Sequence, residues 1–310
     1  MLTRIPFALL AVGFACSLFA APALAQRDRV FVASYGSDTN PCTFGSPCKT
    51  FQQAVNVVAA GGEVTAIDSA GFGPIVITQS VAITSPPGVE AGIVPTSGGD
   101  AITINTTAPA DITLRGLTLE GTGSGLRGID VISSLPESQT GGTLTIVACI
   151  VKDFTGSGIF IHPAMSGGPV MQVVITDSLF IDNGISGIKI SPSMNVSASI
   201  YRTVVSLNAT GIDLGGATGS ISALLVDSNV DNNNNTAISV NATTIIMKHS
   251  TATNTNNGNN TDVSVDANSR MAFFEQNYIH NLSNAGFAYS DGTNIIDSIT
   301  GNALGSQMPQ

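Results

Sequence analysis

A short unit, glycine-containing in most of its copies, returns along the chain at steps of 24 to 33 residues, and this repeat restricts the possible folds more than any other feature. The unit Thr122-Gly-Ser-Gly-Leu126 returns as Thr155-Gly-Ser-Gly-Ile159, and looser copies follow. Every copy ends on an apolar residue, in order Leu126, Ile159, Ile188, Ile212, Ile238 and, in weaker form, Val263 and Phe287. The repeat predicts a stack of similar structural units, because a single unit of this length cannot bury its own apolar face.

Each copy leads into a short segment in which apolar residues alternate with others, such as Ile159–Ile161, Ile188–Ile190 and Ile212–Leu214. A longer β-rich run, such as Leu144–Val151, precedes each copy. Alternation with a period of two buries one face of a strand. Coils of two or three such strands can bury that face by stacking in parallel, about 4.8 Å apart. The predicted fold is a single all-β parallel solenoid.

Composition and pattern argue against other classes of protein. The chain is 43% hydrophobic and only 10% charged, whereas disordered chains combine low hydrophobicity with high charge. A β-sandwich would need hairpin turns between successive strands, and leucine-rich repeats need a leucine spacing that is missing here. A net charge of −10 argues against nucleic acid as a partner.

The first 25 residues have the pattern of a secretory signal peptide. Arg4 precedes the apolar run Ile5–Ala21, and Ala23-Leu24-Ala25 offers the small residues of a cleavage site. We therefore expect cleavage after Ala25 and a secreted or periplasmic protein. No later segment is long and apolar enough to span a membrane.

Three further segments follow. Residues 26–62 are expected to hold a first strand at Arg29–Val32 and an amphipathic helix at Lys49–Ala60, which would cap the open end of the solenoid. Residues 63–300 form the coils, and residues 301–310 form a loose tail.

Cysteine and asparagine residues refine this expectation. Cys42 and Cys48 lie six residues apart, and an oxidising compartment permits a disulfide between them. Cys149 falls in an apolar run and is expected to be a small buried residue. Asparagines such as Asn183 and Asn208 precede the repeated strands, where they suit left-handed turns and could form hydrogen bonds along the solenoid axis.

The segment Phe31-Val-Ala-Ser-Tyr-Gly-Ser-Asp-Thr-Asn-Pro41, followed by Ser46–Ala54, resembles the start of secreted right-handed parallel β-helix proteins of the pectin-lyase-like superfamily. The resemblance implies a right-handed helix, export and a bias toward carbohydrates. It implies no particular reaction, because the superfamily includes lyases, hydrolases, tailspikes and adhesin stalks. The sequence blocks that polygalacturonases carry are not found together in this chain.

Two groups of residues are candidates for a site. Aligning the Thr-Gly-Ser-Gly units places three acids in one column, Glu120, Asp153 and Asp182, which could bind calcium through their carboxylates. The same acids could simply serve as turn residues.

The second group lies on the outward positions of the repeated strands. Phe160, His162 and Asp213 are candidate substrate-binding residues, and Lys189 is the candidate base of a lyase. Lys189 and Asp213 are expected to be neighbours on adjacent coils, which is also what an ordinary cross-strand pair would show.

Two functions fit these residues. The first is a binding or structural module for carbohydrate or a cell-surface glycan. The alternative is a calcium-dependent polysaccharide lyase, or a hydrolase, that acts on acidic glycans. The sequence leaves open whether the protein is an enzyme.

Overall fold

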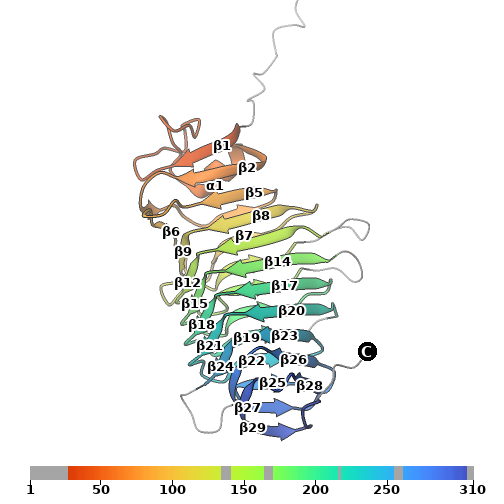
Figure 1. Cartoon of the computed structure of the whole chain (residues 1–310). Helices are drawn as coiled ribbons and strands as arrows, with labels where there is room; N and C mark the ends of the chain where they lie inside the picture. The colour runs from red at the N-terminus through yellow and green to blue at the C-terminus, as the bar shows by residue number, and fades with distance from the viewer. Residues whose placement is uncertain (1–26, 134–140, 164–169, 216–217, 255–260, 306–310) are drawn as a thin grey trace, which may run out of the picture.

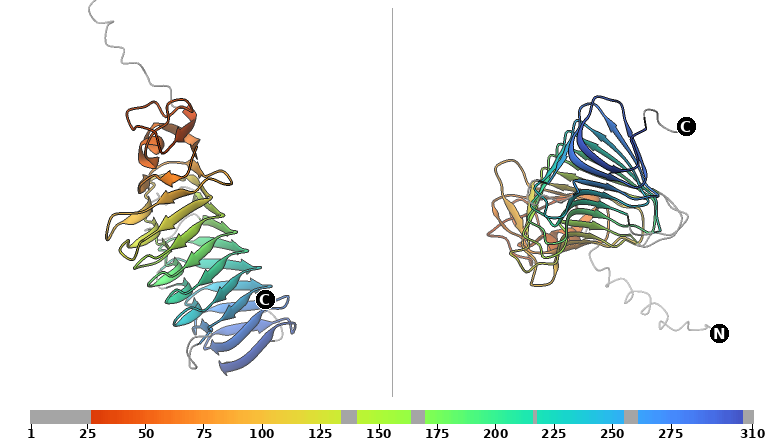
Figure 2. Two further views of the ribbon diagram at one scale, coloured as in Figure 1. Left: turned by 90° about the vertical axis from the view of Figure 1, so that its left-hand side faces the viewer. Right: turned by 90° about the horizontal axis from the view of Figure 1, so that it is seen from below.

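The computed structural model describes residues 27–133, 141–163, 170–215, 218–254 and 261–305, so the expected signal peptide lies outside the described residues. The chain winds into coils that stack along one axis (Figure 1). Neighbouring coils are joined by parallel strand pairs. Viewed along the axis, the coils enclose a narrow interior (Figure 2). The predicted parallel β-solenoid is confirmed.

The strands stack into three faces, which we call A, B and C. Face A is an 11-stranded sheet formed, in order, by β1 (Arg27–Val32), β2 (Val58–Ala66), β5 (Val81–Thr84), β8 (Asp111–Arg115), β11 (Thr143–Val147), β14 (Met171–Thr176), β17 (Val196–Tyr201), β20 (Ile221–Val226), β23 (Thr244–Lys248), β26 (Arg270–Phe274) and β28 (Phe287–Ser290).

Faces B and C belong to one 18-stranded sheet. Face B contains β3 (Ala70–Gly71), β6 (Ala91–Ile93), β9 (Leu117–Glu120), β12 (Ile150–Lys152), β15 (Leu179–Ile181), β18 (Val204–Ser206), β21 (Asn229–Asp231) and β24 (Thr251–Thr253). Face C contains β4 (Ile75–Ile77), β7 (Asp100–Ile104), β10 (Arg127–Val131), β13 (Ile159–Ile161), β16 (Ser186–Ile190), β19 (Thr210–Leu214), β22 (Thr236–Val240) and β25 (Val263–Val265). The long strand β27 (Tyr278–Asn284) pairs with both β24 and β25, and β29 (Ile295–Gly301) pairs with β27.

Aliphatic side chains fill the interior in rows that run from coil to coil. Ile146, Ile175, Ile200 and Leu225 occupy matching positions on four successive strands of face A, and all are buried. Because alternate residues of a strand point to opposite faces, each short apolar alternation supplies one layer of this core.

The β-rich run that precedes each repeat is two strands rather than one. A residue in the left-handed conformation ends the face A strand and turns the chain onto face B, as at Ala148 (φ 53°), Asp177 (φ 54°) and Asp227 (φ 50°). Each coil therefore carries three strands. The sequence does not reveal this bend. A single residue in the left-handed conformation changes the direction of the strand, and the apolar residues on both sides of it look like one continuous run.

Buried polar ladders run between the coils beside the aliphatic rows. The Asn183 amide nitrogen donates a hydrogen bond to Asn208 Oδ1 (2.9 Å), and the Asn208 amide nitrogen donates one to Asn233 Oδ1 (3.0 Å). The expected hydrogen bonding of asparagines along the axis is confirmed. These hydrogen bonds give partners to side-chain amides of asparagines that are buried between the coils.

The N-terminal helix is shorter than predicted. Helix α1 spans Phe51–Val57, its first turn is capped by the Thr50 side chain, and it packs against β1 and β2. The predicted extension to Ala60 is wrong, since Val58–Ala66 forms β2 and pairs with β1. Val57 and Val58 are β-branched, which favours the extended backbone found at Val58.

The prediction for the last repeat is wrong. The repeat places Phe287–Tyr289 in line with the strands of face C, whereas in the structure β28 pairs with β26 on face A. On face C the corresponding position is taken by Leu282–Asn284 of β27, which pairs with β25. At the C-terminal end, Gly305 forms a bridge with Tyr289, so the predicted loose tail is held against the sheet as far as that residue. Residues 306–310 lie outside the described residues.

Cys42 and Cys48 form the predicted disulfide beneath the N-terminal cap. Within the described ranges, no helix is long and apolar enough to cross a bilayer.

Cys149 is buried, as expected, and its Sγ lies 3.4 Å from the Val147 carbonyl oxygen. Burial raises the pKa of the Cys149 thiol to about 11. The thiol should therefore stay protonated at pH 8, and the folded protein should resist alkylation by iodoacetamide. Mass spectrometry of folded and urea-unfolded protein checks this, with modification expected only after unfolding. Rapid modification of the folded protein at pH 8 would contradict the buried position.

Candidate functional site

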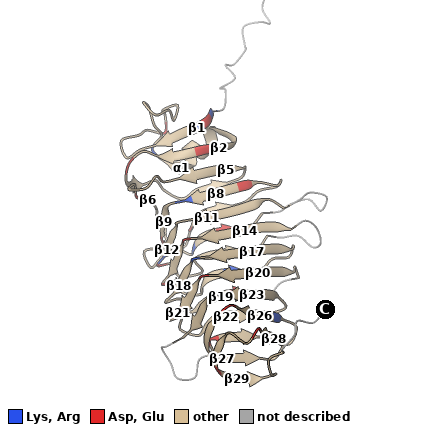
Figure 3. Ribbon diagram, in the orientation of Figure 1, with Lys and Arg blue, Asp and Glu red and all other residues tan. Residues whose placement is uncertain are grey.

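A row of outward side chains crosses face C in the middle of the molecule. Asp130, Phe160, Lys189 and Asp213 occupy matching positions on β10, β13, β16 and β19. Their strand neighbours, such as Ile159 and Ile161, are buried, so the alternation turns these four side chains outward. Charged residues make up 10% of the chain and are scattered over many strands of the ribbon (Figure 3).

Lys189 and Asp213 are neighbours on adjacent coils, as predicted. Lys189 Nζ lies 2.9 Å from Asp213 Oδ2, and both side chains are partly exposed. Lys189 Nζ also lies 5.7 Å from the centre of the Phe160 ring, within the range of a cation–π contact. The structure thus brings together three of the residues that the sequence selected.

Phe160 also contacts His162 of its own coil and Arg127 of the preceding coil. The His162 ring is stacked against it, with ring centres 4.0 Å apart and planes 18° apart. The Arg127 guanidinium carbon lies 5.3 Å from the same ring centre. Phe160 is thus the centre of a group that combines one aromatic ring with nitrogen-bearing side chains from three coils.

Asp130 holds this group in place. Its side chain is only 6% exposed, with Arg127 Nη1 at 3.0 Å from Oδ2 and His162 Nε2 at 2.8 Å from Oδ1. A buried carboxylate held between two such partners fixes the orientation of both. We call Asp130, Phe160, His162, Arg127 and Lys189, with Asp213 and Asp100, the face C cluster.

Asp100 extends the cluster by one coil. It lies opposite Arg127 in the pairing of β7 with β10, and its Oδ2 is 3.8 Å from Arg127 Nη1. Its Oδ1 is buried and has no hydrogen-bond partner among the described residues. Burial, and then the negative charge of Asp130, raise the pKa of the Asp100 carboxyl, while Arg127 opposes this shift.

Sequence alignment missed Asp100, Arg127 and Asp130 because it used the wrong register in one coil. Matching the Thr-Gly-Ser-Gly units places Leu126 opposite Ile159, whereas the structure pairs Ile129 with Ile159. The segment from Glu120 to Ile129 is two residues longer than its counterpart from Lys152 to Ile159. The alternation Ile129-Asp130-Val131 was the signal that could have revealed the true register.

On face B a register shift of one residue separates Glu120 from the other two acids of the proposed calcium column. Glu120 lies opposite Lys152, not opposite Asp153, in the pairing of β9 with β12. Asp153 and Asp182 each follow a face B strand in the left-handed conformation, at φ 61° and 56°.

A lysine lies between the first two of these acids. Lys152 Nζ is 3.2 Å from Glu120 Oε1 and 3.7 Å from Asp153 Oδ2, and the hydrogen bond to Glu120 is the main cause of the raised pKa of Lys152. Lys152 thus supplies positive charge at the position where a cation was expected. In the part of the chain that the structure describes, no three His, Cys, Asp or Glu side chains are grouped so that they could hold a metal ion.

The face C cluster therefore combines several kinds of functional group on one outward surface. It offers an aromatic ring, two cations, a histidine and three carboxylates on the outside of a rigid sheet. Such a surface can stack against one face of a sugar ring and exchange hydrogen bonds with its hydroxyl groups.

Comparison with known proteins gives a likeness of fold. No family model matches the chain, and no curated protein matches it in sequence. Among solved structures, the crystal structure of pectate lyase Pel9A superimposes with a TM-score of 0.52 over 86% of this chain and 79% of that chain, at 14% sequence identity. At that identity the likeness concerns the fold alone. The chain thus has a parallel β-helix fold, which it shares with that structure.

Proposed function

We propose that this protein is an exported module that binds a polysaccharide chain across face C. The observation that carries the proposal is the Phe160 ring with Arg127, His162 and Lys189 all within 5.7 Å of it. An aromatic ring bordered by hydrogen-bonding groups matches a sugar, which has one apolar face and a polar edge. The Cys42–Cys48 disulfide and the secretory pattern of residues 1–25 support export.

The charges of the cluster favour a glycan rich in hydroxyl groups over a dense polyanion. Two cations, Arg127 and Lys189, stand among three carboxylates, and each cation already has a carboxylate partner. A polyanion would meet like charges here, whereas hydroxyl groups can donate to the carboxylates and accept from the cations.

Removing the ring of Phe160 tests the proposal. Phe160→Ala should weaken binding to the preferred glycan about tenfold, since a stacked aromatic contributes roughly 1 kcal/mol or more. The measurement is affinity electrophoresis of the purified protein in gels that contain one neutral or acidic polysaccharide each.

Phe44→Ala is the matched control, because Phe44 is an exposed phenylalanine at the N-terminal cap, away from face C. It should migrate like the unaltered protein in every gel. Equal retardation of the Phe160→Ala and Phe44→Ala proteins would exclude face C as the binding surface.

A second candidate function, hydrolysis of a polysaccharide, is favoured by the pair Asp100 and Asp130. They lie on adjacent coils, and burial raises the pKa of the Asp100 carboxyl, as expected for a general acid. The lyase alternative receives less support, because Lys189 would have to leave its ion pair with Asp213 and lose a proton before it could act as a base.

An activity assay separates binding from catalysis. The protein is incubated with neutral and acidic polysaccharides, with calcium or with a chelator, and new reducing ends and unsaturated products are followed. New reducing ends that vanish in Asp100→Asn would establish hydrolysis, whereas calcium-dependent unsaturated products that vanish in Lys189→Ala would establish the lyase. Glycan binding without any product would establish the binding module.

A further inference from the structure

The C-terminal end of the solenoid has an open sheet edge. Strand β29 is the last strand that the structure describes, and it pairs with β27 on one side and with no described strand on the other (Figure 1). Its outer edge therefore presents backbone N–H and C=O groups to which another strand can bind. Natural proteins often protect such an edge with lysine or proline, and residues 295–301 contain neither.

The apolar core is also uncovered at this end. Ile296 and Ile299 lie opposite Ile279 and Leu282 of the preceding coil, and the latter two are at most 1% exposed. Ile299 points inward in the same way but is 41% exposed, because no further coil lies on it among the described residues. Ile296 and Leu304 are only partly buried against the core. The last coil thus offers an apolar layer that a further layer could cover.

The N-terminal end of the solenoid is closed by contrast. Helix α1 packs there against β1 and β2, and its Phe51 is fully buried. The outer edge of β1 is paired as well, since the N–H groups of Phe31 and Ala33 donate to the carbonyls of Cys42 and Cys48 at 2.9 and 3.0 Å. A second copy therefore cannot extend the stack from head to tail. In the described chain, the end that matches the open one is the same end of another copy.

We infer that two copies of this protein join through their C-terminal ends, with the two β29 strands paired antiparallel across a two-fold axis. Residues 295–296 of β29 continue face B, because they pair with the part of β27 that pairs with β24. Residues 299–301 continue face C, because they pair with the part that pairs with β25. The corner between the two faces thus lies near residues 297 and 298. An axis through this corner places face B of each copy against face C of the other, and face A against face A.

The residues of β29 match one another in this arrangement. With the axis between residues 297 and 298, Ile296 lies opposite the partner's Ile299, and both point inward. Ile295 lies opposite the partner's Thr300, and both point outward. A shift of one residue would pair inward with outward side chains, so the apolar pattern selects this register.

The charges of the last coil tolerate the same register. Asp297 lies opposite the partner's Ser298 and not opposite a second carboxylate. Its Oδ2 already lies 3.1 Å from both His280 Nδ1 and the Tyr278 hydroxyl. The two Asp297 side chains stand on opposite sides of the corner, each beside its own histidine. No pair of like charges is therefore forced together directly.

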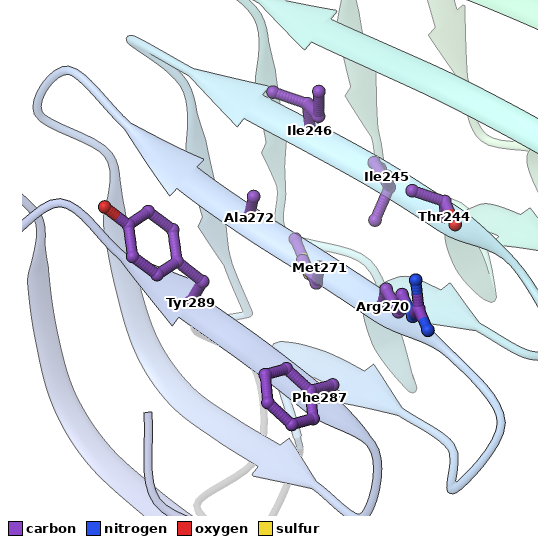
Figure 4. A pocket seen from close by; sticks show the side chains of 8 residues that line it. All are labelled: Thr244, Ile245, Ile246, Arg270, Met271, Ala272, Phe287 and Tyr289. Carbon is purple, nitrogen blue, oxygen red and sulfur yellow. The ribbon is translucent and has the colours of Figure 1, made fainter. Parts of the chain in front are cut away.

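The border of the open end on face A is apolar too. Phe287 and Tyr289 share the outer side of β28, the strand before the last coil, and half of Phe287 is exposed (Figure 4). Together with Arg270 and Ala272 they line a groove of about 170 Å³. Since the axis brings face A of both copies together, these side chains add apolar surface beside the dimer interface.

Analytical ultracentrifugation of the purified protein tests the inference. The sedimenting mass should rise from one chain toward two between about 1 and 100 μM, as expected for a small interface. Ile299→Lys should raise the dissociation constant of the dimer at least about tenfold, because it places a charge in the apolar layer between the copies. Ile150→Lys is the matched control, since Ile150 is 39% exposed on face B in the middle of the solenoid. It should dimerise like the unaltered protein.

A disulfide cross-link tests the register by a gain of signal. The double variant Ile295→Cys, Thr300→Cys should form a covalent dimer under mild oxidation, because each new thiol lies opposite the other kind in the partner. Each single variant should stay unlinked, since its two thiols lie five residues apart along the strands, about 17 Å. A mixture of the two single variants should again cross-link. The native cysteines do not interfere, because Cys42 and Cys48 are bonded and Cys149 is buried.

The outcomes are distinct and do not depend on glycan binding by face C. A dimer that Ile299→Lys weakens, that Ile150→Lys retains and that only the paired cysteines trap supports the inference. A monomer at every concentration, a dimer that Ile299→Lys leaves unchanged, or equal cross-linking of a single variant would overturn it. So would dimerisation that appears only after deletion of residues 306–310, because those residues would then cover the open end in the full chain.

Discussion

Asn208→Ala is expected to lower the free energy of unfolding by roughly 3 kcal/mol or more. Asn208 Oδ1 accepts hydrogen bonds from the backbone and the side chain of Asn183, at 3.0 and 2.9 Å. Its amide nitrogen donates to the carbonyls of Phe180 and Ser206, as well as to Asn233 Oδ1. An alanine would leave several of these groups buried without a partner, and each such group costs roughly 1–3 kcal/mol.

Urea unfolding followed by circular dichroism measures this loss. Asn105→Ala is the matched control, because Asn105 is exposed at the end of β7. That variant should change the free energy of unfolding by less than about 0.5 kcal/mol. If Asn208→Ala unfolds at the same urea concentration as Asn105→Ala, the ladder contributes little to stability.

Gly187→Val is expected to cost roughly 3 kcal/mol as well, for a steric reason. Gly187 is the glycine of the repeated unit in the coil that contains β16. A Cβ atom there would overlap Val205 Cγ1 and would lie 2.9 Å from Asn208 Nδ2 and 3.0 Å from the Gly211 carbonyl oxygen. All three neighbours are confined, since Val205 is buried in the core, Asn208 is a member of the buried ladder and the carbonyl is backbone of the next coil.

Gly71→Val is the matched control for this prediction. Gly71 lies in strand β3, and a Cβ atom there would have no neighbour within 4 Å. Thermal unfolding of the two variants should therefore differ widely. Equal stability of both would show that the coils can separate enough to admit a side chain beside Asn208.

The double variant Gly187→Val, Asn208→Ala should lose less stability than the sum of the two single losses. Truncating Asn208 removes one of the three atoms that the new side chain would meet, so the two sites are coupled.

The repeated glycine, which the sequence showed only as a recurring letter, thus has a physical reason. In three successive coils, Gly158, Gly187 and Gly211 each face the backbone of the following coil and an asparagine of the ladder. Glycine is often required where the backbone is left-handed. That reason does not apply at these three positions, because their φ angles lie outside the left-handed region. Glycine and asparagine recur together because they occupy the same crowded corner of the coil.

For the residues of the candidate site, the predicted alignment across coils is confirmed from Phe160 to Asp213. Phe160, Lys189 and Asp213 stand at the same point of the alternation in coils of similar length, so their alignment followed from the repeat. Asp100 and Asp130 escaped detection because the turn before β10 is longer than its counterparts. The residues that hold Phe160 and His162 in place were therefore the ones that sequence comparison could not align.

The sequence by itself determined the architecture and the direction in which most side chains point. Alternation with a period of two assigns each residue of a strand to the core or to the outside, and this depends only on neighbours in the chain. Only the tertiary structure decided which outward residues meet across coils, since register depends on the length and conformation of every turn. Phe287 and Tyr289, which the repeat predicts on face C, lie on face A in the structure, where they line a groove with Arg270. A local pattern fixes which face a side chain occupies, whereas contact between coils depends on the path of the chain through the turns that join them.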